Sequence, residues 1–127
     1  MKMAASVRYI VHDVQAALDF YTHRLGFQLD HNAVPAFASV TRDELRLLLS
    51  GPGSSGARPQ ADGSRPVPGG WNRILITVAD IEAEVKRLRS SGSKFRGEII
   101  KGVGGSQIWL EDPSGNLIEL FQPSEKI

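Results

Sequence analysis

Asp112-Pro113-Ser114-Gly115-Asn116-Leu117-Ile118-Glu119-Leu120 is the stretch that decides the fold of this 127-residue chain. Its first half is a turn sequence, because Pro113 presets φ for a turn position and Gly115 tolerates a positive φ. Residues 117–121 then read as a strand in which Glu119 stands among apolar residues. A carboxylate in such a strand needs a polar partner, a metal or water, because burying it alone is costly. The stretch therefore predicts a turn and a strand that carries Glu119 on a solvated face or in a polar cleft.

The same order of elements is predicted twice along the chain. Asp13 and Asp80 each precede apolar residues at helical spacing, and an aspartate is a favourable N-cap. Gly26 and Gly92 stand where these two helices are expected to end. Strands are expected over residues 7–11, 27–31, 36–41 and 45–50, and again over 74–78, 95–100, 106–110 and 117–121. Each half therefore reads as β-α-β-β-β, and we interpret the chain as a tandem repeat of one module.

Residues 112–120 resemble the C-terminal signature of the vicinal oxygen chelate superfamily, which contains the glyoxalases, bleomycin-resistance proteins and extradiol dioxygenases. Val11-His12-Asp13-Val14, Phe20-Tyr21 and Leu25-Gly26-Phe27 resemble the opening of the same fold. The resemblance implies an α+β, glyoxalase-like fold, in which two tandem βαβββ modules form a curved mixed sheet around a cleft, with the helices outside. It also implies a homodimer.

Residues 51–70 are expected to join a first module, residues 6–50, to a second module, residues 71–123, within a single glyoxalase-like domain spanning residues 1–127. This joining segment is rich in Gly, Pro, Ser and Arg and has no hydrophobic period. A loop of this length in a compact domain is usually a linker or a lid. A flexible linker is the simpler interpretation of its middle, whereas Trp71 directly after two glycines suggests a lid. The length allows the modules to pair within one chain or to swap across a dimer.

Composition and charge exclude several classes of function. The formal net charge is +1 and the basic residues are scattered, which argues against nucleic-acid binding. No apolar run approaches the roughly 20 residues that a membrane-spanning helix needs. Cysteine is absent, which excludes disulfides, thiolate metal sites and cysteine nucleophiles. Residues 1–6 lack the apolar core of a signal peptide, so a cytoplasmic protein without nucleic-acid or membrane partners is expected.

Strand alternation predicts one apolar face under the helices and one mixed face toward the cleft. An excess of arginine on the mixed face favours an anionic ligand, because a guanidinium group holds carboxylate or phosphate bidentately. Aromatic walls suit a small flat molecule. The alternative is that Arg73 pairs with Glu119 across the strands, while Arg8 and Arg46 reach water at the rim. The candidate ligand-binding residues are Arg8, Arg46, Trp71, Arg73, Gln107, Trp109, Glu119 and Phe121.

The resemblance implies that a metal, if present, would be held by the first and last strands of each module. The corresponding positions here are Ser6, Leu48, Arg73 and Glu119. Glu119 is the single plausible ligand among them, since Leu48 has no donor atom and Arg73 is a cation, whereas a divalent metal usually takes three or four ligands. The histidines show no ligand spacing. We therefore expect no cofactor, and an ion pair between Arg73 and Glu119 where the metal would sit.

The favoured hypothesis is a metal-independent binding protein of the glyoxalase/bleomycin-resistance type, which holds a small anionic or aromatic molecule in the inter-module cleft. Trp71, Trp109 and Phe121 would stack on the ligand, and Gln107 would orient it. The alternative is a metal-dependent lyase, isomerase or dioxygenase of the same superfamily. In that case Glu119 would be the catalytic base or a lone protein ligand, and substrate or a dimer mate would supply the other ligands. A third interpretation is a cleft closed by its own side chains.

Overall fold

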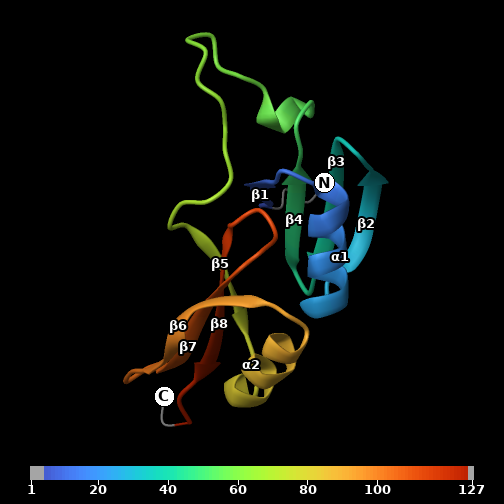
Figure 1. Cartoon of the computed structure of the whole chain (residues 1–127). Helices are drawn as coiled ribbons and strands as arrows, with labels where there is room; N and C mark the ends of the chain where they lie inside the picture. Colours follow the sequence, from blue (N-terminus) through green and yellow to red (C-terminus); the bar gives the residue numbers. More distant parts are fainter. Residues whose placement is uncertain (1–4, 126–127) are drawn as a thin grey trace. The chain divides into compact units, whose positions relative to one another are not determined.

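The computed structural model describes residues 5–125. The chain folds into two compact units. The first unit comprises Met1–Gly69 and the second comprises Gly70–Ile127. Each unit holds a four-stranded mixed sheet and an α-helix, in the order β-α-β-β-β (Figure 1). The predicted tandem βαβββ repeat is therefore confirmed.

The sheet of the first unit has the strand order β1-β4-β3-β2. β1 runs parallel to β4, and the other neighbouring pairs are antiparallel. Helix α1 packs against β3 and β4. The elements are β1 (Val7–Ile10), α1 (Val14–Arg24), β2 (Gln28–Ala33), β3 (Phe37–Arg42) and β4 (Leu45–Ser50).

The second unit repeats this topology, with the strand order β5-β8-β7-β6. β5 runs parallel to β8, and the remaining pairs are antiparallel. Helix α2 contacts β8. The elements are β5 (Arg73–Thr77), α2 (Ile81–Ser90), β6 (Lys94–Lys101), β7 (Gly105–Glu111) and β8 (Leu117–Pro123).

Both helices begin at the predicted aspartates. A side-chain oxygen of Asp13 accepts a hydrogen bond of 3.0 Å from the amide of Ala16. Asp80 accepts the equivalent bond of 3.1 Å from the amide of Ala83. Each bond satisfies one of the backbone donors that the first turn of a helix leaves open. The predicted N-caps are confirmed, and the chain uses the same cap in both modules.

The helices end at the predicted glycines. Gly26 and Gly92 have φ values of 72° and 86°, a region that favours glycine. After α2, the amide of Gly92 donates to the carbonyl of Arg89, and the amide of Ser93 donates to that of Leu88. These two bonds form a Schellman motif, which stops the helix and turns the chain into β6.

The core of each unit lies between the helix and the apolar face of its sheet. In the first unit, the fully buried Tyr21 packs edge-on against both Phe20 and Phe27. In the second unit, the buried face of the sheet is made by alternate residues of three strands. They are Ile74, Ile76, Val78, Ile108, Leu110, Ile118 and Leu120. The predicted apolar face is therefore confirmed in the second unit, because each of these positions alternates with a mixed-face residue. Its counterparts in the first unit are also buried, namely Tyr9, Val11, Leu47 and Leu49.

Strand boundaries differ from the predicted ones by one or two residues at most ends. β2 begins at Gln28 instead of residue 27, because the amide of Phe27 donates to the carbonyl of Tyr21 and so belongs to the end of α1. Residues 51–70 contain a short 3₁₀ helix, η1 (Ser55–Ala57), and a turn closed between Gln60 and Ser64. Within residues 5–125, no helix is long and apolar enough to cross a membrane.

Candidate functional site

The mixed face of the second sheet gathers most of the candidate residues. The strand register places Glu119 on β8 opposite Trp109 on β7, and Gln107 opposite Phe121. Arg73 is the first residue of β5, which pairs with the other edge of β8. Residues paired across neighbouring strands share a face of a sheet, so these side chains stand together.

Arg73 and Glu119 form the central ion pair of this face. The Nε atom of Arg73 lies 2.8 Å from a carboxylate oxygen of Glu119. The Glu119 side chain is 9% exposed, whereas that of Arg73 is 27% exposed. The buried carboxylate thus has the cationic partner that it needs, and the predicted ion pair is confirmed. A second bond, 3.1 Å from Arg73 Nη1 to the carbonyl of Trp71, fixes the direction of the guanidinium group.

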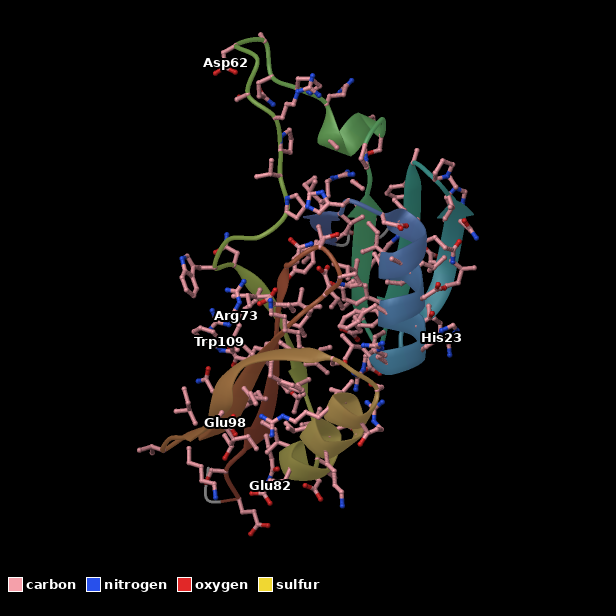
Figure 2. The ribbon with its side chains drawn as sticks, viewed as in Figure 1. His23, Asp62, Arg73, Glu82, Glu98 and Trp109 are labelled. Carbon is pink, nitrogen blue, oxygen red and sulfur yellow. The ribbon has the colours of Figure 1, made fainter. Side chains whose placement is uncertain are left out.

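The guanidinium group of Arg73 also stacks on an aromatic ring. Its carbon lies 4.1 Å from the centre of the Trp109 ring, and Figure 2 shows the two side chains next to each other. The Trp109 indole N–H donates a hydrogen bond of 2.9 Å to the side-chain oxygen of Gln107. This bond orients the indole, so that the ring presents a fixed flat surface beside a fixed cation.

Trp71 extends the aromatic surface toward solvent. Its side chain is exposed, and its ring lies 6.2 Å from that of Trp109 in an edge-to-face arrangement. The guanidinium carbon of Arg96, on β6, lies 5.9 Å from the Trp71 ring. Arg96 is itself held by Glu111 at 2.8 Å. The two tryptophan rings therefore lie next to each other, with the Arg73 guanidinium group near Trp109 and that of Arg96 near Trp71.

A hollow of about 220 Å³ adjoins this cluster between β6 and β7. Arg96, Gln107 and Trp109 line it, together with Gly97 and Ile100. The pairing of β6 with β7 shifts register between Arg96 and Ile100, and Gly97 has a φ of 81°. This irregularity bends β6 and opens the hollow beside the aromatic cluster.

Arg96 is a residue that the sequence prediction missed. Its distance in sequence from Glu111 and Trp71 gives no local signal, and the shifted register of β6 breaks the alternation that would assign its face. The one signal in the sequence that could have pointed to Arg96 is that it stands in a predicted strand and is followed by a glycine, Gly97.

Arg8 and Arg46 lie in the first unit, where each has a local partner. Arg8 Nη1 donates a hydrogen bond of 2.7 Å to the hydroxyl of Ser50. Arg46 pairs with Asp30 at 3.0 Å, and the buried Ser39 hydroxyl donates to the same carboxylate oxygen at 2.7 Å. The Ser39 bond, followed by the Arg46 bond, lowers the pKa of Asp30 below its usual value. The predicted ligand role of these two arginines stays a prediction.

Comparison with protein-family models shows to which family the chain belongs. The model of the Glyoxalase/Bleomycin resistance protein/Dioxygenase superfamily matches residues 4–120. The chain belongs to this superfamily. The predicted family and glyoxalase-like fold are thereby confirmed.

Proteins from several bacteria are similar to nearly the whole chain. A crystal structure of a member from Sphaerobacter thermophilus has 29% identity and a TM-score of 0.77, and covers 96% of this chain and 98% of its own. TnmS3, an antibiotic binding protein from Streptomyces sp. CB03234, has 26% identity and a TM-score of 0.67, with 98% and 99% covered. An uncharacterized protein of Shewanella frigidimarina is 27% identical, with 94% of this chain and 93% of that protein covered.

The repeat defines which positions correspond between the two modules of this superfamily member. The amide of Val11 donates to the carbonyl of Ser50, and the amide of Val78 donates to that of Phe121 in the same way. Ser6 precedes Val11 by the same distance along the chain as Arg73 precedes Val78, so these two positions correspond. Leu48 likewise precedes Ser50 by the same distance as Glu119 precedes Phe121, so these two also correspond.

These four positions, at which the resemblance implies the metal ligands of the superfamily's metal enzymes, do not fit a divalent metal. Leu48 supplies no donor atom, and Arg73 is a cation already engaged by Glu119. Residues 5–125 contain no group of three or more His, Cys, Asp or Glu side chains placed to hold a metal ion. The donor set that such an ion requires is therefore incomplete.

Proposed function

We propose that this chain binds a small anionic or aromatic molecule on the mixed face of its second sheet, without a metal. The observation that carries the proposal is the fixed position of Arg73 between Glu119 and Trp109. A guanidinium group has five N–H donors. The Nε and Nη1 atoms of Arg73 have partners, whereas Nη2 has no hydrogen-bond partner among the described residues. An anion can therefore bind Arg73 without breaking the ion pair.

The surroundings of Arg73 suit a flat ligand. Trp71 is 70% exposed, although a large aromatic side chain gains from burial. A planar molecule stacked on Trp71 would cover that surface and extend into the hollow lined by Gln107 and Arg96. Phe121, opposite Gln107 on β8, would add an apolar contact. The ligand class that fits is an aromatic molecule with a carboxylate or another acidic group.

Two further observations support binding over catalysis. The chain is 26% identical to TnmS3, an antibiotic binding protein, over nearly the full length of both chains. The position equivalent to Glu119 in the first module is Leu48, so a metal-dependent lyase, isomerase or dioxygenase would lack a ligand there. The enzymatic alternative would also require Glu119 to leave its ion pair with Arg73.

We further propose a domain organisation and an oligomeric state. Residues 6–50 and 71–123 act as the two modules of one glyoxalase-like domain, and residues 51–70 link them. The protein acts as a homodimer, as the superfamily resemblance implies.

The proposal is tested by calorimetric titration of the full chain with benzoate and 1-naphthoate. Wild-type protein should bind both compounds, and naphthoate more tightly because it covers more of Trp71. Arg73→Ala and Trp71→Ala should each weaken binding about tenfold or more. Lys101→Ala removes an exposed charge from β6 and serves as the control. Unchanged affinity in Trp71→Ala, whose exposed side chain contributes little to folding, would overturn the proposal.

A further inference from the structure

Residues 51–70 are attached to the first sheet at their beginning. The amide of Gly51 donates to the carbonyl of Ala36 at 2.9 Å, and the hydroxyl of buried Ser54 donates to the carbonyl of Gly51 at 2.7 Å. Next, η1 lies against β1 and β4. A C-β atom at Gly56 would overlap the Arg8 guanidinium group, so the backbone of η1 packs directly on that side chain. This part of the segment therefore has a defined position on the first unit.

The remainder of the segment folds back as a hairpin. The amide of Gln60 donates to the carbonyl of Ser64 at 2.7 Å, and the amide of Gly63 donates to the carbonyl of Gln60 at 2.9 Å. Asp62, labelled at the tip in Figure 2, accepts bonds from both the amide and the hydroxyl of Ser64. These bonds bring the chain before Gln60 and the chain after Ser64 close together.

A cavity of about 380 Å³ lies within the first unit between the two arms of this hairpin and the end of β1. Its volume falls in the range of small-molecule sites, roughly 300 to 1,000 Å³. Rigid proline rings and aliphatic side chains form much of its wall. They are Ile10, Pro52, Pro59, Pro66, Val67 and Pro68. The cavity thus offers an apolar surface to a ring or a branched chain.

Two arginines line this cavity, Arg58 and Arg65. Neither has a hydrogen bond or an ion pair with any residue from 5 to 125. Every other arginine of the chain contacts a carboxylate, a carbonyl, a hydroxyl or an aromatic ring. The two arginines without a described partner, both exposed, therefore line the same cavity, much of whose wall is apolar.

We propose that this cavity is a second ligand site, for an aromatic oxyanion such as an aryl phosphate or aryl carboxylate. Arg58 and Arg65 bind the oxyanion, because their planar forks match its oxygens, and the proline rings pack on the aromatic body. The site lies entirely in the first unit and uses none of the residues around Arg73, so it does not rest on the function proposed above.

The test is a ¹⁵N NMR titration of the full chain with phenyl phosphate, inorganic phosphate and phenol. Phenyl phosphate should shift the amides of Ser54, Ala57 and Val67, which line the cavity. Inorganic phosphate and phenol should each bind about tenfold or more weakly, since each offers one half of the recognition. No shift of these amides, or an equal affinity for inorganic phosphate, overturns the proposal.

Variants assign the response to the two arginines. Arg58→Gln with Arg65→Gln should weaken phenyl phosphate binding about tenfold or more. Lys86→Gln with Lys101→Gln removes the same charge from the second unit and should leave the affinity unchanged. The affinity is read from the Ser54, Ala57 and Val67 amides alone, whereas binding at Arg73 would shift amides of the second unit, so the two proposed sites succeed or fail separately. An unaltered affinity in the Arg58/Arg65 double variant, or an equal loss in the Lys86/Lys101 double variant, overturns the proposal.

Discussion

The guanidinium carbon of Arg73 lies 4.1 Å from the centre of the Trp109 ring. A cation stacked in this way on an indole is stabilised by about 0.5–2 kcal/mol, depending on how much water reaches it. The superfamily resemblance implies that Arg73 corresponds to a ligand position of the metal enzymes. The chain keeps the shared fold and has a cation at that position, which Glu119 holds in an ion pair.

The ion pair between Arg73 and Glu119 should show a large coupling energy. Arg73→Leu leaves the nearly buried carboxylate without a partner and should lower the free energy of unfolding by about 2 kcal/mol, reduced by the partial exposure of the pair. The double variant with Glu119→Leu should recover part of this loss. Urea unfolding of the four proteins should give a coupling of about 1–3 kcal/mol. Additive single effects would show that the pair contributes no coupling.

The donor set around Glu119 predicts that the protein does not bind transition metals stoichiometrically. Untagged protein should contain little metal by elemental mass spectrometry, both as purified and after incubation with Zn, Ni, Mn and Fe salts followed by desalting. Leu48 and Arg73 are the physical reasons, since one has no donor and the other repels a cation. One equivalent of metal that disappears in Glu119→Gln would contradict this expectation and restore the enzymatic alternative.

Asp30 should make the stability of the first unit depend on acid pH. The hydrogen bond from Ser39, followed by Arg46, lowers its pKa below the usual value of 3.8. A lowered folded-state pKa stabilises the fold above pH 3.8, and the contribution is lost as the pH falls through the folded-state value. The carboxyl carbon of Asp30, followed by ¹³C NMR, should therefore titrate below pH 3.8. Ser39→Ala should raise that midpoint, and an unmoved midpoint would refute the assignment.

Gly56→Ala should disturb the attachment of the 51–70 segment. The added methyl group would displace the Arg8 guanidinium group and break its bond to Ser50, at a cost of about 1 kcal/mol. Gly104→Ala is the matched control, because no atom lies within 4 Å of a C-β atom built there. Amide hydrogen exchange at Ser54 and Ala57 should accelerate in the first variant alone. Equal protection in both variants would show that Arg8 does not hold this turn.

Local signals made most of the fold predictable from the sequence. Asp13 and Asp80 cap helices that begin within three residues of them, and Gly26 and Gly92 terminate those helices, so each signal and its effect are neighbours in the chain. Alternation then assigned the apolar faces. The exact strand ends were less predictable, because pairing extends them: β7 begins at Gly105, which is paired with Pro123 of β8.

The candidate site residues were predictable where regular strand alternation determines which face of the sheet a side chain occupies. Glu119, Trp109 and Gln107 lie on regular strands, and the ion pair of Glu119 with Arg73 was predicted and found. Arg96 escaped prediction because its strand changes register beside it. The ion pair of Arg46 with Asp30 was not predicted for the same reason, since Asp30 lies where β2 shifts register against β3. Irregular strands place residues by tertiary packing, which the local sequence does not specify.

The tyrosines and tryptophans are divided between the units, so that each unit has its own spectroscopic signal. Both tyrosines, Tyr9 and Tyr21, belong to the first unit, and both tryptophans belong to the second. Tryptophan emission therefore arises in the second unit, and the tyrosine resonances arise in the first. The duplicated halves of the chain can thus be followed separately during unfolding. Whether they unfold together or in sequence is measurable without a label, a dye or a substitution.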